Sequence, residues 1–235
     1  MKSLRLHRWN VTPREAARIQ LRLRERLELQ DRLPRIETVA GTDVALDLRR
    51  GRAIAGAIVY RFPEMEEIER VWAEGRLTFP YVPGLLSFRE IPVLLTALAR
   101  VRHAPDVIFC DGQGYAHPRR FGIACHLGVL LDCPTIGCAK SILVGTAEEP
   151  GRKAGAWTPL VDGGEVVGAA LRTREAVKPV YISQGHRISL GRAIELARAA
   201  SDGFRIPKPT READHFVEEV KRGESQQRRR GAGAK

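Results

Sequence analysis

The sequence lacks any apolar run close to the roughly 20 residues that a membrane-spanning helix needs. Its first ten residues, MKSLRLHRWN, also lack the apolar stretch of a secretion signal. We therefore expect a cytoplasmic protein that makes no membrane contact. Aromatic residues are few, at 6%, but hydrophobic residues make up 43% of the 235 positions, so the chain is long and apolar enough to bury a sizeable core.

Two nucleotide-binding signatures are also missing. No Gly-Lys pair followed by Ser or Thr occurs, which excludes a P-loop. The stretch DGQGYAH at residues 111–117 has two glycines of a dinucleotide loop, but His117 stands where a third glycine or alanine belongs, and Pro118 disfavours a helix at that point. The two glycines instead favour close approach of the backbone to a ligand.

Paired cysteines of the C-x-x-C type are absent. The four cysteines, Cys110, Cys125, Cys133 and Cys138, are separated by spacings that match no zinc-binding pattern. Their neighbours are apolar or small. We interpret them as buried, reduced side chains in a reducing compartment.

Basic residues exceed acidic ones, giving a formal net charge of +11. A phosphate-bearing partner explains such an excess, and so does a surface that simply uses arginine widely. Part of the excess is local, because residues 221–235 contain six basic side chains and one glutamate. That segment is almost free of apolar residues, so we predict a disordered basic tail at 221–235 after a single domain at 1–220.

The order of expected elements indicates an α/β domain. A helix begins at Pro13 behind a capping box of Thr12 and Glu15, with Ile19, Leu23 and Leu27 forming its apolar stripe. Two strands within 35–62 form a hairpin that turns at Gly51. Residues 77–90 are predicted as a loop. Further elements are helices over 91–101, 121–132 and 190–200, strands over 105–112, 134–141 and 177–186, and a hairpin over 156–174. This order predicts a mixed β-sheet flanked by helices.

Two aspartates stand where sheets of this kind bind ligands. Asp111 ends a buried strand, and Asp43 interrupts a strand that otherwise belongs to a core. If the two strands are neighbours, the carboxylates can share a hard divalent cation such as Mg²⁺. The alternatives are a solvent-facing Asp43 and a turn at Asp111.

Glu90 belongs to SFRE, which has the form of a capping box. However, a helix capped by Ser87 would put Pro92 inside its second turn, where the ring clashes with the backbone. We therefore expect the helix to start at Pro92 and Glu90 to lie just outside it as a free acid.

Four blocks of sequence resemble the endonuclease V family, the inosine-directed nucleases of DNA and RNA repair. They are GTDVA at 41–45, PYVPGLLSFRE at 80–90, DGQGYAHPRRFGIACHLGVLLDCPTIGCAKS at 111–141, and VKPVYISQGHRISL with IPKPTREAD at 177–190 and 206–214. The resemblance spans residues 10–217 and leaves out the tail. It implies a ribonuclease H-like fold. It also implies Mg²⁺-dependent hydrolysis of the second phosphodiester 3′ to an inosine, which leaves a 3′-hydroxyl and a 5′-phosphate.

The resemblance also implies roles for single residues. Asp43, Glu90 and Asp111 match the acidic metal-binding set, and Asp214 matches a fourth position at which some members have histidine. Tyr81, within the segment Pro80, Tyr81, Val82 and Pro83, matches a wedge that fills the gap left by the displaced base. The implied cofactor is Mg²⁺, with Mn²⁺ as a substitute, and the implied substrate is inosine-containing DNA, with RNA as the alternative.

Other residues near these acids suit phosphate chemistry. Lys140 follows a strand and can place a fixed positive charge near the phosphate. His117 can act near the leaving oxygen or be a hydrogen-bonded loop histidine, and Arg119 and Arg120 can contact phosphates or be solvated charges. A pocket that reads the oxygen of the flipped base needs backbone N–H groups. Its candidates are Gly112, Gly114, Ile123, Gly137 and Leu143.

Two other functions are consistent with parts of the sequence. One is a different ribonuclease H-like nuclease, of the junction-resolving or excision-repair type. The other is a nucleic-acid-binding protein without catalysis, although such a protein gains nothing from three carboxylates in its groove. We expect a monomer, because no apolar stripe is left over for a partner.

Overall fold

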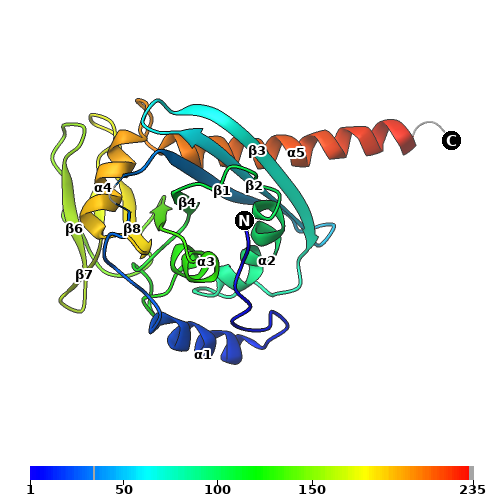
Figure 1. Ribbon diagram of the computed structural model, residues 1–235, viewed down its shortest axis with the longest axis horizontal. Coiled ribbons are helices and arrows are strands. Elements are labelled where there is room, and N and C mark those ends of the chain that lie inside the picture. The colour runs from blue at the N-terminus through cyan, green and yellow to red at the C-terminus, as the bar shows by residue number, and fades with distance from the viewer. Residues whose placement is uncertain (34, 233–235) are drawn as a thin grey trace.

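The computed structural model describes residues 1–33 and 35–232, and for 224–232 it describes the course of the helix alone. Among these residues, eight strands form one mixed sheet in the order β3-β2-β1-β4-β5-β8-β7-β6 (Figure 1). The strands are β1 (Thr38–Asp47), β2 (Arg52–Arg61), β3 (Glu66–Arg76), β4 (Val107–Asp111), β5 (Thr135–Ala139), β6 (Trp157–Asp162), β7 (Glu165–Leu171) and β8 (Val180–His186). The helices are α1 (Pro13–Arg24), α2 (Leu86–Leu98), α3 (Ile123–Leu131), α4 (Leu190–Ala199) and α5 (Lys208–Ala232). None of the described helices has the length and apolar composition to cross a membrane.

The predicted mixed sheet is confirmed. Strands β1, β4 and β5 run parallel to one another, whereas β2, β3, β8, β7 and β6 join through antiparallel pairs. Two layers of helix cover the sheet. Apolar side chains of α2 and α3, such as Ile91 and Leu127, pack on one face. Those of α4 and α5, such as Ile194 and Phe216, pack on the other. The four cysteines are free and buried, as expected.

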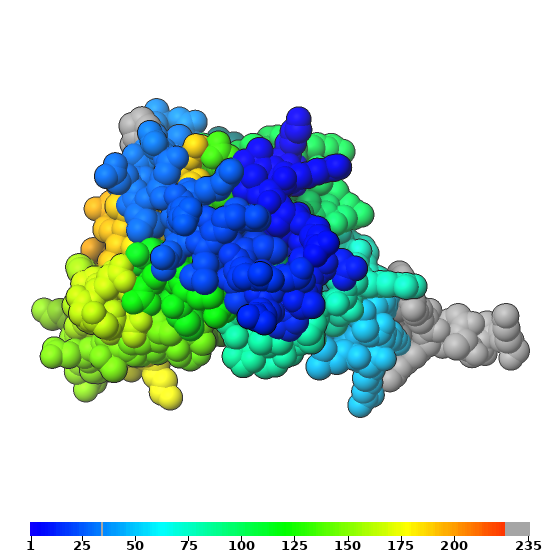
Figure 2. Space-filling view, turned by 90° about the horizontal axis from the view of Figure 1, so that it is seen from below, coloured from blue at the N-terminus to red at the C-terminus, as the bar shows by residue number. Residues whose placement is uncertain are grey.

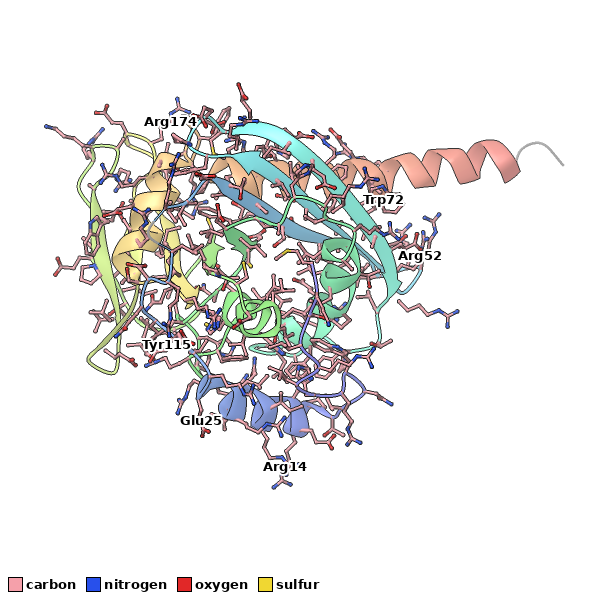
Figure 3. The ribbon with its side chains drawn as sticks, viewed as in Figure 1. Arg14, Glu25, Arg52, Trp72, Tyr115 and Arg174 are labelled. Carbon is pink, nitrogen blue, oxygen red and sulfur yellow. The ribbon has the colours of Figure 1, made fainter. Side chains whose placement is uncertain are left out.

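Helix α1 lies outside α3 and covers one side of the molecule (Figure 2). It begins with the predicted capping box, because Thr12 accepts from the Glu15 N–H and the Glu15 carboxylate accepts from the Thr12 N–H. Arg14 points from its outer face into solvent (Figure 3). The predicted stripe packs inward, because Leu23 is buried and Ile19 and Leu27 are partly buried against the same cluster. Ala16 and the polar Gln20 are buried as well and were not part of the prediction.

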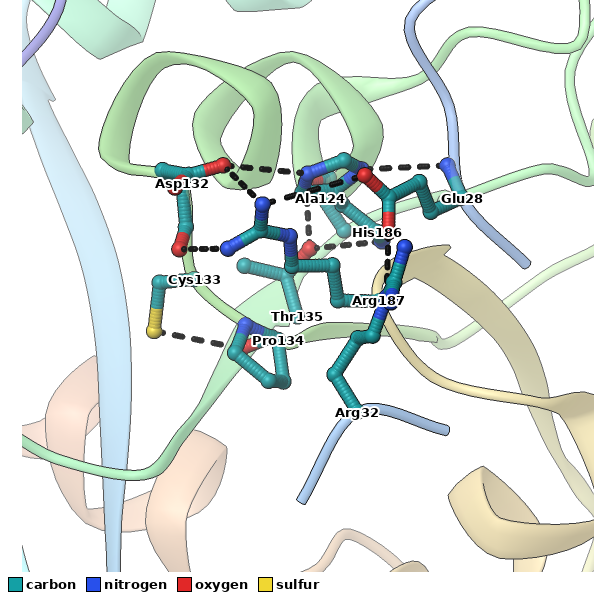
Figure 4. A network of polar contacts seen from close by, with 9 residues as sticks. All are labelled: Glu28, Arg32, Ala124, Asp132, Cys133, Pro134, Thr135, His186 and Arg187. Carbon is teal, nitrogen blue, oxygen red and sulfur yellow. Dashed lines mark hydrogen bonds and ion pairs between the residues drawn. The ribbon is translucent and has the colours of Figure 1, made fainter. Parts of the chain in front are cut away.

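A polar network joins α3 to β5 and to the residue that follows β8 (Figure 4). Arg187 donates to the Asp132 carbonyl at 3.1 Å and forms an ion pair with the Asp132 carboxylate at 2.8 Å. Thr135 donates to the Ala124 carbonyl at 2.7 Å, which joins β5 to α3. These bonds fix α3 against β5 and β8, and thereby fix the loop that precedes α3.

Helix α2 corrects the expectation that a helix starts at Pro92. It begins at Leu86 and contains both Glu90 and Pro92, and its N-cap makes no side-chain hydrogen bond. The reason is burial: Phe88, Ile91 and Leu94 are all at most 2% exposed, and packing of this apolar face outweighs the loss of one helical hydrogen bond at proline. Glu90 consequently sits on the rigid helix rather than in a loop.

Two elements were not predicted. Strand β3 is an edge strand rich in charged residues, so it has little of the apolar alternation that marks a half-buried strand. Helix α5 was missed although Ala213, Phe216, Val217 and Val220 follow helical spacing. It extends to Ala232, but the side chains from residue 224 on lie outside the described residues. The disorder proposed for residues 221–235 therefore stays a prediction.

Glycine at position 41 lets α5 approach the sheet. A Cβ atom at Gly41 would stand 1.9 Å from the Pro209 carbonyl oxygen, and one at Gly56 would stand 2.6 Å from a Val217 methyl. The helix therefore packs directly on the backbone of β1 and β2. This contact determines where Asp214, five residues after Pro209 on the same helix, lies relative to β1.

We predict that Gly41→Ala lowers the free energy of unfolding by about 3 kcal/mol or more, because backbone atoms of α5 must move to admit the methyl group. Urea denaturation followed by circular dichroism measures the loss. Gly51→Ala is the matched control: nothing lies within 4 Å of its Cβ, and its φ of +60° costs an alanine about 1 kcal/mol. Equal losses in the two variants would contradict the close-packing argument.

Candidate active site

A pocket of about 520 Å³ opens at the carboxyl ends of the parallel strands. This volume is within the usual range for small-ligand sites, about 300–1,000 Å³. Four acids line it: Asp43 from β1, Glu90 from α2, Asp111 from β4 and Asp214 from α5. The acids that the sequence analysis grouped therefore come together from four elements far apart in the chain.

The parallel pairing of β1 with β4 places the two aspartates. Thr42 stands opposite Cys110 in the register, so the residues that follow them, Asp43 and Asp111, lie side by side. Thr42 reinforces this pairing by donating to the Phe109 carbonyl at 3.3 Å. Strands β1 and β4 are therefore neighbours, which is the condition for Asp43 and Asp111 to share a cation.

The charges of these acids affect one another. Burial, and then the negative charge of Asp111, raise the pKa of Asp43 to about 7. Burial and the charges of Asp43 and Asp111 raise the pKa of Glu90 to about 8. Crowded carboxylates that cannot all ionise have the electrostatics of a cation-binding site or of an acid–base pair.

Lys140, predicted to lie near the phosphate, stands between two of the acids. Its Nζ atom donates to Asp111 at 2.9 Å and to Asp214 at 3.2 Å. Partial burial acts against the charged amine, but the bonds to Asp111 and Asp214 outweigh it and raise the pKa of Lys140. The pocket therefore contains a permanent positive charge beside its acids.

Tyr81 stands at the rim of the pocket and is 71% exposed. The guanidinium carbon of Arg89 lies 6.0 Å from the ring centre. Val82 and Pro83 also line the pocket, whereas Pro80 is exposed outside it. An aromatic ring presented to solvent beside a pocket is suited to stacking on a base.

Some of the predicted base-pocket residues line the pocket and others support it. Gly112, Ile123 and Leu143 line it. Gly114 and Gly137 do not, because each faces backbone: a Cβ at Gly114 would stand 2.4 Å from the Gln184 carbonyl oxygen, and one at Gly137 would stand 2.2 Å from the Gly114 nitrogen. These two glycines permit close packing behind the pocket wall.

The two arginines expected at the phosphate make contacts within the protein. Arg120 forms ion pairs with Asp162 and Glu165, both at 2.7 Å. The Arg119 guanidinium donates to the Gln20 side chain at 2.6 Å and to the Gly84 carbonyl at 2.7 Å. Neither of them lines the pocket.

His117 is in the pocket wall but is only 3% exposed. Its Nε2–H donates to the Gly84 carbonyl at 2.9 Å, and its Nδ1 accepts from the Arg119 N–H at 3.1 Å. Burial and the charge of Arg119 lower the pKa of His117 to about 4. Because both ring nitrogens are occupied and the ring is neutral, the geometry favours the loop role over the role at the leaving oxygen.

Other pocket residues were not singled out from the sequence. Gln20 of α1 lies on a buried helix face, and a polar residue at such a position is a signal that could have identified it. Gln113 donates to the Ser141 carbonyl at 2.9 Å. Further lining residues are Ser87, Gly122, Ala139 and Ile142.

Within the part of the chain that the structure describes, no three His, Cys, Asp or Glu side chains stand ready to hold a metal ion. The four carboxylates nevertheless have the hard oxygen donors that Mg²⁺ prefers. Burial, and then the neighbouring acids, raise the pKa values of Asp43 and Glu90, so ionisation of both is unfavourable unless a cation offsets their charge. The donor set therefore fits a divalent cation, although its side chains must draw closer to bind one.

Comparison with known proteins identifies the family. Residues 21–215 match the family model described as Endonuclease V. An endonuclease V from Roseiflexus sp. (strain RS-1) is 52% identical over 206 residues, which cover 88% of this chain and 92% of the relative. One from Nostoc sp. (strain PCC 7120) is 48% identical over 212 residues, covering 90% and 96%.

Solved structures agree with these matches. The crystal structure of endonuclease V from Streptomyces avermitilis superposes with a TM-score of 0.88 at 43% identity, covering 92% of this chain and 96% of that one. The Ciona intestinalis enzyme, solved in complex with a DNA 24-mer that contains an inosine followed by a ribo-adenosine, gives a TM-score of 0.78 at 27% identity, covering 89% and 98%. These matches exclude the junction-resolving and non-catalytic alternatives. The chain is an endonuclease and belongs to the endonuclease V family.

Proposed function

We propose that this endonuclease recognises inosine in DNA and hydrolyses the second phosphodiester on its 3′ side, leaving a 3′-hydroxyl and a 5′-phosphate. RNA is the alternative substrate, and the protein acts as a cytoplasmic monomer. The observation that carries the proposal is the convergence of four carboxylates and Lys140 in one pocket, beside an exposed tyrosine at the rim. The related Ciona intestinalis enzyme in complex with inosine-containing DNA supports it.

The residues that would hold the cofactor are Asp43, Glu90, Asp111 and Asp214, and we propose Mg²⁺, with Mn²⁺ as a substitute. When bound, Mg²⁺ supplies an activated water and neutralises charge on the pentavalent phosphate. Asp43 and Glu90 give up their protons when they become ligands, because carboxylates bind metals in the ionised form. Asp214 accepts a hydrogen bond from Lys140. Its carboxylate can bind the cation directly or through a water molecule.

Lys140 supplies the protein's own electrostatic contribution. Its amine is held by Asp111 and Asp214, so its position is fixed before the substrate arrives. A preorganised cation beside the scissile phosphate stabilises the charge that develops on the phosphate oxygens. The ion pairs also keep Lys140 protonated over the whole working range of pH.

The base would enter between α3 and the loop at Leu143. The N-terminus of α3 opens into the pocket at Gly122 and Ile123. The Gly122 N–H already donates to the Gly114 carbonyl at 2.9 Å and the Ala124 N–H to the Gln113 carbonyl at 3.1 Å, so the donor proposed for the base is the Ile123 N–H. Such a donor matches the C6 oxygen of inosine and opposes the amine of adenosine. The Gly112 N–H is excluded from this role, because it already donates to the Cys138 carbonyl at 3.2 Å. Tyr81 would then occupy the gap in the strand, which offsets part of the cost of flipping the base.

We predict that Asp43→Ala and Asp111→Ala each lower the single-turnover cleavage rate by roughly 100-fold or more, because each removes a carboxylate from the charge-stabilising site. The assay uses Mg²⁺ and labelled duplexes with inosine, a plain mismatch or a four-way junction. Asp47→Asn, on the same strand but outside the pocket, is the control and should cut like the wild type. Equal cutting of inosine-containing and undamaged duplexes would refute the proposed substrate, and a cut at another phosphate would refute the proposed position.

We also predict a pH dependence of stability in EDTA. Asp43 and Glu90 ionise at about 7 and about 8 in the folded protein, whereas unfolded acids ionise near pH 4. Between about pH 4 and pH 8 the folded state therefore binds more protons, so the free energy of unfolding falls as the pH rises. Glu90→Gln removes part of this fall and should be the more stable protein at pH 8, by on the order of 2 kcal/mol.

Urea denaturation at several pH values measures this effect, with Asp47→Asn as the control. Addition of MgCl₂ should flatten the wild-type profile, because a ligand that binds the ionised acids stabilises the folded state. Parallel profiles for wild type and Glu90→Gln would show that Glu90 does not ionise as described.

A further inference from the structure

The loop that carries Tyr81 ends at Gly84, which has a left-handed backbone with a φ of +76°. A Cβ atom at Gly84 would stand 2.8 Å from a nitrogen of the Arg119 guanidinium. The backbone conformation favours glycine at this position, and a side chain here would displace the Arg119 guanidinium from its place. This position is where the loop at 80–83 joins the rest of the fold.

Three side chains donate to the Gly84 carbonyl oxygen. They are Gln20 Nε2 at 3.1 Å, His117 Nε2 at 2.9 Å and Arg119 Nη2 at 2.7 Å. A carbonyl oxygen has two lone pairs, so three donors saturate it. The donors come from α1 and from the segment before α3, and together they join these two parts of the chain to the loop.

The donors are also fixed by one another. Gln20 uses its whole amide, because it accepts from Arg119 Nε at 2.6 Å and donates a second time to the Phe121 carbonyl at 3.1 Å. His117 accepts from the Arg119 N–H. A polar group this deeply buried is stabilising only when every bond is made, and Gln20 is 1% exposed. The cluster therefore has one arrangement.

We propose that Gln20, His117 and Arg119 form a clamp on the Gly84 carbonyl that positions the 80–83 loop for insertion of Tyr81 into the substrate strand. This inference rests on the proposed function, in which Tyr81 fills the space of the flipped base. The three residues are positioning residues, since they act through the loop rather than on the phosphate. Helix α1, outside the sheet, thereby becomes part of the recognition apparatus.

The first test uses no nucleic acid. Gln20→Leu keeps the volume but removes two donors and an acceptor. Amide hydrogen exchange at Tyr81, Val82 and Gly84, the residues of 80–84 that have an N–H, should therefore become about tenfold faster or more, in line with loss of hydrogen bonds to a buried carbonyl and a charged group. Thr12→Ala is the matched control, because it weakens the same helix through its cap and leaves the clamp intact. Unchanged exchange at 80–84 in Gln20→Leu overturns the clamp.

The second test is a double-mutant cycle on binding to an inosine-containing duplex in EDTA, titrated by fluorescence anisotropy. Gln20→Leu should weaken binding about tenfold when Tyr81 is present. It should have no further effect in a Tyr81→Ala background, because the clamp acts through that ring. Equal weakening in both backgrounds overturns the positioning role and assigns Gln20 to general stability.

The two tests separate this inference from the proposed function. A wild-type protein that binds inosine-containing and adenosine-containing duplexes equally well refutes the proposed function, whereas the exchange experiment still decides whether the clamp holds the loop.

Discussion

The crowding of buried carboxylates where β1 and β4 lie side by side is the constraint on which the rest of this structure depends. Asp43 and Asp111 are side by side because β1 and β4 run in the same direction, and Glu90 adds a third negative charge from α2. Burial of these acids, and then their mutual repulsion, raise the pKa values of Asp43 and Glu90, and both effects oppose folding when the acids are ionised. The protein is therefore less stable because of the acids that form its active site. The ion pair between Lys140 and Asp111 offsets part of this loss of stability.

The rest of the structure serves to hold these charges in place. Helix α5 reaches the site because glycines at 41 and 56 let it lie on the sheet backbone. Helix α2 carries Glu90 on a rigid turn because its apolar face is fully buried in spite of Pro92. Each acid is thus mounted on regular structure, while the aromatic ring that meets the substrate is on a loop at the rim.

Much of this could be predicted from the sequence. The strand that contains Asp43 and the strand that ends at Asp111 have strong local signals, whereas their adjacency was only a condition for a shared cation and is supplied by the structure. The position of Glu90 could not be derived, because a local rule about proline competes with burial that depends on the whole fold. The clamp was hidden for a similar reason: Gln20 and Gly84 are 64 residues apart, and neither shows its partner in the local pattern. His117, Arg119 and Arg120 have side chains that suit phosphate binding, but in the structure they form hydrogen bonds and ion pairs with other groups of the protein.

The burial of the cysteines has a practical consequence for following motion in this protein. Cys110 and Cys138 are in the two central parallel strands, and burial raises the pKa of both thiols to about 12. Alkylating reagents attack the thiolate, so these sulfurs react when the sheet itself opens and not when a rim loop fluctuates. Alkylation of Cys110 and Cys138 therefore measures global opening of the protein, and local rearrangements around the substrate do not change it.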